Sequence, residues 1–164
     1  MGMNSQERTK LIEQYADGPR RLRAAWDAVP AAARQWRPAA GEWSAHEVVV
    51  HCADSETQAA GRIRLLVTDP DPVIQGYDEA QWARDLDYHA HPLEVALATV
   101  DAVRAHTTVL IRRLPDEAWL KEGRHTESGH YTAEDWLRIY ADHLENHARQ
   151  IEANVAAWRA SGKG

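Results

Sequence analysis

Four long stretches of the chain place apolar residues three or four positions apart, with polar residues between them. This spacing is typical of amphipathic helices, because 3.6 residues complete one helical turn. The stretches predict helices over residues 5–29, 45–67, 92–114 and 133–159. In the third, the pattern assigns the inward face to Val95, Ala96, Val103, His106, Leu110 and Leu114. In the fourth, it assigns that face to Trp136, Leu137, Tyr140, Leu144, Ile151, Val155 and Trp158.

Polar residues that commonly cap helices stand where several of these stretches begin. Ser44, followed three positions later by Glu47, has the sequence of a capping box, in which side chain and backbone satisfy each other. Thr132 precedes the fourth helix, and Asp78 precedes a short additional one. Pro19 lies inside the first helix and predicts a kink or a split there.

The connections between the helices contain few strand patterns. Residues 68–82 are rich in Pro, Asp and Gly and are predicted to form a loop up to the short helix. Residues 121–132 are polar and predict a loop or a small hairpin. We therefore expect an all-α fold, a four-helix bundle with short extra helices in its connections. One domain should span residues 1–164, with a frayed tail over 160–164. The linkers after the first two helices are long, so a simple up-down-up-down order is not assured.

Composition narrows the function classes. The formal net charge is −6, so the chain lacks the basic surface typical of nucleic-acid-binding proteins. No apolar stretch approaches the roughly 18 residues that would predict a membrane-spanning helix. The N-terminal residues have no secretory pattern, and the single cysteine, Cys52, excludes an intramolecular disulfide. These features favour a cytoplasmic protein that acts on small molecules rather than on nucleic acid or membranes.

Three histidines form the candidate chemistry. His143 and His147 lie one turn apart on the inward side of the fourth helix, and His51 lies beside the apolar stripe of the second. Two histidines at this spacing can chelate a divalent metal, although Leu144 stands where a zincin would have its catalytic Glu. Three His ligands and an open position are typical of catalytic sites. The alternative is a set of half-buried, hydrogen-bonded histidines without a metal.

Other residues near these histidines have more than one interpretation. Glu47 precedes His51 by one turn and can orient its ring, although the capping role is the stronger interpretation. Trp43, next to the cap, is the tryptophan expected to shape a pocket wall. His106 is either a fourth imidazole near the site or a core histidine, and Cys52 is expected in the core. No protein nucleophile or other catalytic residue is evident.

Three segments together resemble the DinB superfamily, in its YfiT-like branch: "GEWSAHEVVVHCADSE", "GYDEAQWA" and "ADHLENHARQI". The resemblance extends from about Trp26 to Ile151. It implies a four-helix bundle in which His51, His143 and His147 hold one divalent metal ion per chain, zinc or nickel. It also implies thiol S-transferases that use a low-molecular-weight thiol, a thiol-dependent isomerase, or metal-dependent hydrolases.

Three functions follow as hypotheses. The first is a metal-dependent transferase in which the cation binds a low-molecular-weight thiol as the thiolate, which attacks an electrophile. The second is hydrolysis by metal-bound hydroxide. The third is a non-catalytic metal-binding stress protein. The absence of a well-placed carboxylate base favours the first hypothesis. Separately, we expect a homodimer, because helical bundles often pair through a remaining apolar face.

Overall fold

The computed structural model describes residues 2–163. Four long helices carry the architecture: α1 (Ser5–Asp27), α2 (Ala45–Thr68), α4 (Leu93–Ile111) and α5 (Ala133–Trp158). The short elements are η1 (Ala31–Ala33), β1 (Val73–Ile74), α3 (Glu79–Asp85), η2 (Tyr88–Ala90), η3 (Asp116–Leu120), β2 (Glu122–His125), β3 (Gly129–Thr132) and the π-helical turn η4 (Arg159–Lys163). The predicted four-helix bundle is confirmed, with each long helix within three residues of its expected ends.

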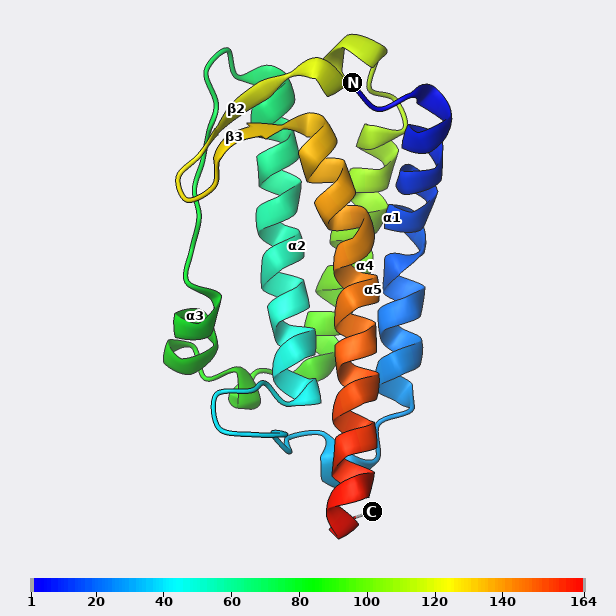
Figure 1. The fold of residues 1–164 in the computed structure, drawn as a ribbon, viewed down its shortest axis with the longest axis vertical. Helices are drawn as coiled ribbons and strands as arrows, with labels where there is room; N and C mark the ends of the chain where they lie inside the picture. Colours follow the sequence, from blue (N-terminus) through cyan, green and yellow to red (C-terminus); the bar gives the residue numbers. More distant parts are fainter. Residues whose placement is uncertain (1, 164) are drawn as a thin grey trace.

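The order of the helices around the bundle differs from a simple up-and-down arrangement. α1 packs against α5 and α4, and α2 packs against α4 and α5, so α1 and α2 are nearly diagonal. Figure 1 shows α2 and α4 running in one direction and α1 and α5 in the other. The segment between α2 and α4 therefore returns along the length of the bundle. It carries β1 and α3 on one side of α2 (Figure 1).

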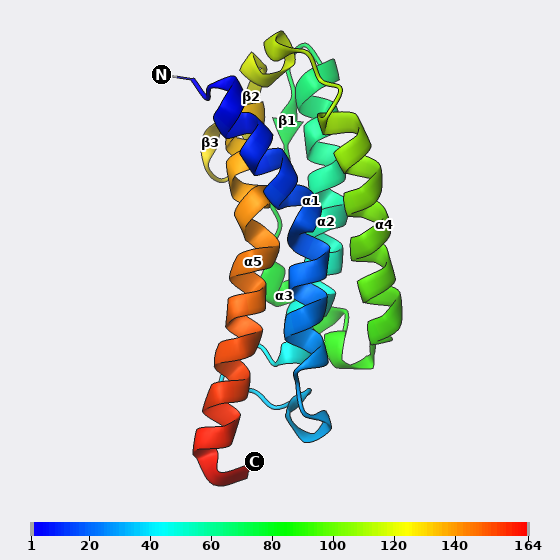
Figure 2. The ribbon, with the colours of Figure 1, turned by 90° about the vertical axis from the view of Figure 1, so that its right-hand side faces the viewer.

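The predicted capping signals lie at the helix ends. Ser44 and Glu47 form a complete capping box at α2, and Thr132 forms another with Asp135 at α5. Asp78 caps α3 through the backbone N–H of Gln81. α1 remains one helix across its internal proline and bends near its middle (Figure 2). Local side-chain chemistry therefore sets the start of three helices.

The expected inward face of α4 is confirmed for Ala96, is half-buried at Val103, Leu110 and Leu114, and is wrong for Val95 and His106. Val95 is 54% exposed and His106 is also exposed, whereas Leu97, Val100 and Arg104 are buried. The helix is rotated about its axis relative to the prediction, because a charged residue occupies the middle of its buried stripe. A pattern that treats arginine as a surface residue assigns the stripe to the wrong side. In α5, by contrast, every residue of the expected inward face is buried.

A small sheet covers the end of α2 where the sequence predicted a loop. Val73 of β1 pairs in parallel with Arg124 of β2, and β2 forms the predicted hairpin with β3. Gly123 permits this approach, since a Cβ there would lie 2.5 Å from the Pro72 carbonyl oxygen. β1 was missed because two residues carry no periodic signal and their pairing partner lies about fifty positions away.

A π-helical turn over residues 159–163 follows α5 and contains Gly162 at a φ of 74°, and residue 164 lies outside the described part. The frayed tail over 160–164 stays a prediction. Within residues 2–163, the structure has no helix that is both long enough and apolar enough to cross a membrane.

Candidate metal centre

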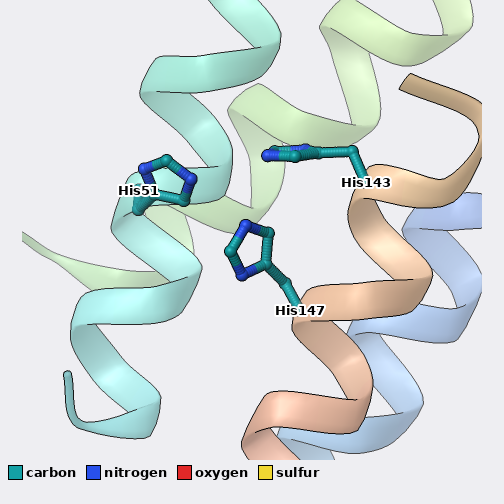
Figure 3. Close-up of side chains that lie close together, drawn as sticks. All are labelled: His51, His143 and His147. Atoms are coloured by element: carbon teal, nitrogen blue, oxygen red, sulfur yellow. The ribbon is translucent and has the colours of Figure 1, made fainter. Parts of the chain in front are cut away.

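The structure brings the three predicted histidines together between α2 and α5. One ring nitrogen from each of His51, His143 and His147 lies within 4.8 Å of the others. The ring centroids of His143 and His147 are 4.6 Å apart, and His51 is 4.7 Å from His147 and 5.5 Å from His143. Figure 3 shows the three rings turned toward one common space. Among the described residues, these three form the group suited to a metal ion.

Two rigid helices fix this arrangement. The capping box holds the first turn of α2, so His51 is placed two turns into a helix whose neighbours Val48 and Cys52 are fully buried. His143 and His147 are four residues apart on α5, which puts both rings on the side that faces α2. Sites on helices of a packed bundle are held more precisely than sites on loops.

A buried carboxylate orients His143. The Nδ1–H of His143 donates to Oε1 of Glu56 at 3.0 Å, and this carboxylate is fully buried on α2. Because Nδ1 carries the proton, Nε2 keeps the lone pair that a metal requires. Burial by itself would raise the pKa of Glu56, but the Arg104 guanidinium and the His143 N–H hold that pKa below its ordinary value. Glu56 therefore stays ionised and accepts from His143.

Arg104 connects this carboxylate to the rest of the bundle. Its Nε and Nη2 atoms each donate to one oxygen of Glu56 at 2.6 Å. Its Nη1 donates to the carbonyl oxygen of Tyr15 at 2.6 Å, and Nη2 also donates to that of Tyr140 at 2.8 Å. One α4 side chain thus contacts α1, α2 and α5. The buried pair links the position of His143 to the packing of all four long helices.

His147 has a separate partner. Its Nδ1–H donates to Oε1 of Gln150, three residues later on α5, at 2.9 Å. Burial and the neighbouring His143 lower the pKa of His147 to about 4. Burial and the other two imidazoles lower the pKa of His51 further, to about 2. Both rings are therefore neutral near pH 7, as metal ligands must be.

His51 shows the fit of this centre to a cation most directly. It is 1% exposed, and its buried Nδ1 has no hydrogen-bond partner among the described residues. Three imidazoles crowded in a buried space gain little from one another, since His143 and His147 lower the pKa of His51 and His143 lowers that of His147. One divalent ion would satisfy the three lone pairs at once, and imidazole suits zinc, nickel, copper and iron. The donor set therefore fits a metal ion.

The other candidate residues divide into neighbours and non-neighbours of the centre. The Trp43 ring is 4.7 Å from that of His51, so Trp43 does form a wall there. Glu47 makes the capping box and an ion pair with Arg37, and the structure gives it no contact with His51. The interpretation of Glu47 as the residue that orients His51 is therefore wrong, whereas its capping role is confirmed. His106 is exposed on α4 and is not part of the centre.

Three supporting residues were missed from the sequence: Glu56, Arg104 and Gln150. Helical periodicity does not select Glu56, because it lies five residues after His51, a spacing that does not place two side chains on one face. Arg104 carried a usable signal. It continues the stripe formed by Leu97 and Val100, and a charged residue in a buried stripe requires a buried counter-charge.

A polar cavity of about 240 Å³ lies beside the centre. Arg62, Tyr77, Glu79 and Tyr140 are among its lining residues. Tyr140 separates it from the histidines, with its ring centroid 5.6 Å from that of His143. Burial raises the pKa of Glu79, which lies close enough to His143 for the two to interact electrostatically.

Comparison with known proteins agrees with this geometry. YfiT from Bacillus subtilis, described as "a probable metal-dependent hydrolase with an unusual four-helix bundle topology", superposes with a TM-score of 0.86 over 98% of this chain and 91% of that one, at 24% identity. At this identity the likeness shows the fold.

Relatives in sequence extend the comparison. A protein of Oceanobacillus iheyensis named "Putative metal-dependent hydrolase" is 34% identical over 68% of this chain, and one of Halalkalibacterium halodurans with the same description is 24% identical over 67%. The matched region spans 64% of the length of each of these two relatives. The sequence model of the DinB superfamily matches residues 14–151. This chain therefore belongs to the DinB superfamily.

Proposed function

We propose that this protein is a metal-dependent enzyme in which His51, His143 and His147 hold one divalent ion, zinc or nickel, and that it transfers a low-molecular-weight thiol to an electrophile. The observation that carries the proposal is the ligand set itself, three imidazoles with no carboxylate among them. Such a set leaves the full charge of the cation for an anionic substrate. A bound divalent ion would supply the stabilisation that keeps a thiol deprotonated at neutral pH.

The residues around the centre support this chemistry. Glu56 cannot serve as a base while both of its oxygens accept from Arg104, so it holds His143 in place. Trp43 covers His51 and limits access of water on that side. In the transfer, the sulfur forms a bond to the electrophilic carbon and the leaving group departs with its bonding electrons. The thiol proton is released to solvent, so no protein base is required.

Hydrolysis is the second candidate, and Glu79 favours it. This carboxylate lies near His143, and its raised pKa suits a group that takes a proton from an attacking water. The names of the relatives point in the same direction. We place hydrolysis second because Glu79 lies at the start of the short helix α3 and makes no hydrogen bond or ion pair with the three histidines. The difference between the two candidates is whether turnover requires a thiol.

One assay separates the candidates. Metal-loaded protein is incubated with a chloro-nitroaromatic or a bimane, with and without bacillithiol, mycothiol, glutathione or cysteine. We expect turnover only when a thiol is present, about one metal ion per chain, and loss of both turnover and metal in His51→Ala. His130→Ala is the matched control, because His130 pairs with Glu122 on the exposed hairpin. Metal-dependent cleavage of an ester or amide without any thiol would replace transfer with hydrolysis.

A further inference from the structure

The cavity beside the metal centre contains charges of both signs that do not pair with one another. Arg62, Glu79 and Glu127 all line it. Within residues 2–163, Arg62 makes no ion pair, and the carboxylates of Glu79 and Glu127 have neither an ion pair nor a hydrogen bond. Opposite charges in a partly buried space normally pair, because water screens them poorly there. Their separation leaves room for a ligand that carries both charges.

Two hydrogen bonds hold Arg62 in place and leave its Nε–H unpaired. Its Nη1 donates to the Tyr140 hydroxyl at 2.9 Å, and its Nη2 donates to the carbonyl oxygen of Gln75 at 2.8 Å. Its buried Nε–H has no hydrogen-bond partner among the described residues, and the buried Tyr77 hydroxyl has none with good geometry, although the Ser55 side chain lies near it. The Arg62 guanidinium lies 5.8 Å from the centre of the Tyr77 ring. Two adjacent unsatisfied donors, one of them cationic, are suited to a carboxylate.

The acidic side of the cavity comes from two other segments. Glu79 is the first residue of α3, and Glu127 lies in the turn between β2 and β3. Glu127 covers Gly76, where a Cβ would lie 2.4 Å from the Glu127 carboxyl carbon. A purely anionic ligand would meet repulsion from these carboxylates, and a purely cationic one would meet it from Arg62. A zwitterion avoids both costs.

We propose that this cavity binds the α-amino-acid end of the thiol substrate, with the carboxylate at Arg62 and Tyr77 and the ammonium group at Glu79. The inference rests on the proposed thiol transfer. That reaction needs no protein base, so Glu79 is available to bind the substrate. Tyr140 lines the cavity, and its ring centroid lies 5.6 Å from that of His143, so the cavity adjoins the metal centre. The substrate class is therefore a cysteine derivative with free amino and carboxyl groups.

A thioether series tests the cavity without depending on thiol chemistry. S-methyl-L-cysteine carries both charges, 3-(methylthio)propanoate only the negative one, 2-(methylthio)ethylamine only the positive one, and 2-(methylthio)ethanol neither. Calorimetric titration into the purified protein should give an affinity for S-methyl-L-cysteine at least about tenfold higher than for the other three compounds. Equal affinities across the series would overturn the proposal.

Variants assign the contacts. Arg62→Met and Glu79→Gln should each lower the affinity for S-methyl-L-cysteine by about tenfold or more. Tyr77→Phe removes a hydroxyl that has no hydrogen-bond partner with good geometry, so it should fold normally and still lower the affinity several-fold. Arg64→Met and Asp85→Asn are the controls, because Arg64 bonds to Ala60 and Asp85 to Gln81 outside the cavity. If the two single variants Tyr77→Phe and Arg62→Met both bind S-methyl-L-cysteine with the wild-type affinity, the assignment is refuted.

The outcomes for the cavity and for the proposed function can be told apart. Binding of S-methyl-L-cysteine that persists in His51→Ala but is lost in Arg62→Met supports the cavity even if no thiol transfer is found. Thiol transfer whose KM is the same for cysteine and 2-mercaptoethanol, and unchanged in Arg62→Met, overturns the cavity and leaves the proposed function in place.

Discussion

The substitution Glu56→Gln tests the link between the fold and the metal centre. It keeps the shape of the side chain, but it removes the negative charge that accepts from both Arg104 and His143. Arg104 is then a buried cation, 1% exposed, without a counter-charge. His143 keeps at most a neutral amide oxygen, a weaker acceptor than a carboxylate, to hold its proton on Nδ1. One substitution therefore affects both the stability of the bundle and the orientation of a metal ligand.

The magnitude follows from the contacts that remain. Removing one partner of a buried ion pair costs about 3–5 kcal/mol of unfolding free energy. Arg104 keeps two backbone carbonyl acceptors, from Tyr15 and Tyr140, so we expect the free energy of unfolding to fall by about 3 kcal/mol. Loss of the group that orients a metal-bound histidine lowers metal affinity about 10–100-fold. Urea unfolding measures the first effect, and competition with a chromogenic chelator measures the second.

Two further variants separate these effects. Gln150→Ala removes the partner of His147 without leaving a buried charge, so it should weaken metal binding with little change in urea stability. Replacing the pair by Glu56→Leu with Arg104→Met should recover much of the stability but not the metal affinity, because no charge is then left unpaired. A Glu56→Gln protein that unfolds within about 0.5 kcal/mol of wild type, as a surface variant would, refutes the reasoning.

The remaining predictions concern the capping box and self-association. Burial alone would raise the pKa of Glu47, but Arg37 and the Ser44 N–H hold that pKa below its ordinary value of 4.5. The ionised Glu47 therefore contributes its full stabilisation above pH 4.5, and this contribution is lost as the pH falls through the pKa of the folded state. Glu47→Gln should therefore flatten the acid limb of the unfolding free energy against pH, and an unchanged limb would contradict this. The outer face of α4 exposes apolar residues, with Val109 57% exposed, and we predict a homodimer through this face. Sedimentation should give twice the chain mass of 18.5 kDa for wild type and one chain mass for Val109→Asp, and a monomeric wild type would exclude the dimer.

Local signals explain how much of this fold could be predicted. The capping residues Ser44 and Thr132 act within four residues of their own helix, so they specify where α2 and α5 begin without knowledge of the tertiary structure. The pairing of β1 with β2 depends on Gly123 meeting Pro72 across the chain, and no local pattern encodes that contact. Elements defined by their own sequence were therefore predicted, and elements defined by a distant partner were not.

The same division applies to the centre. His51, His143 and His147 could be selected because their positions on two amphipathic helices follow from helical periodicity. Glu56 and Arg104 could not, because each is unfavourable in a core by itself and acceptable only with the other. The ion pair also explains why the buried face of α4 is rotated relative to the prediction. Periodicity analysis assigns arginine to the exposed face of a helix, but Arg104 lies on the buried face.

The distribution of the site over the fold suggests how its chemistry and its substrate preference are separated. The three histidines and the carboxylate that orients one of them lie on α2 and α5, two long helices that pack against each other in the bundle. The cavity residues Tyr77 and His125 come from the segment before α3 and from the hairpin, and these connections lie on the outside of α2 (Figure 1). Connections tolerate substitution better than packed helices do. Changes at Tyr77 and His125 can therefore alter the substrate preference without touching Glu56, Arg104 or Gln150, whereas Arg62 and Tyr140 lie on the helices that carry the metal centre.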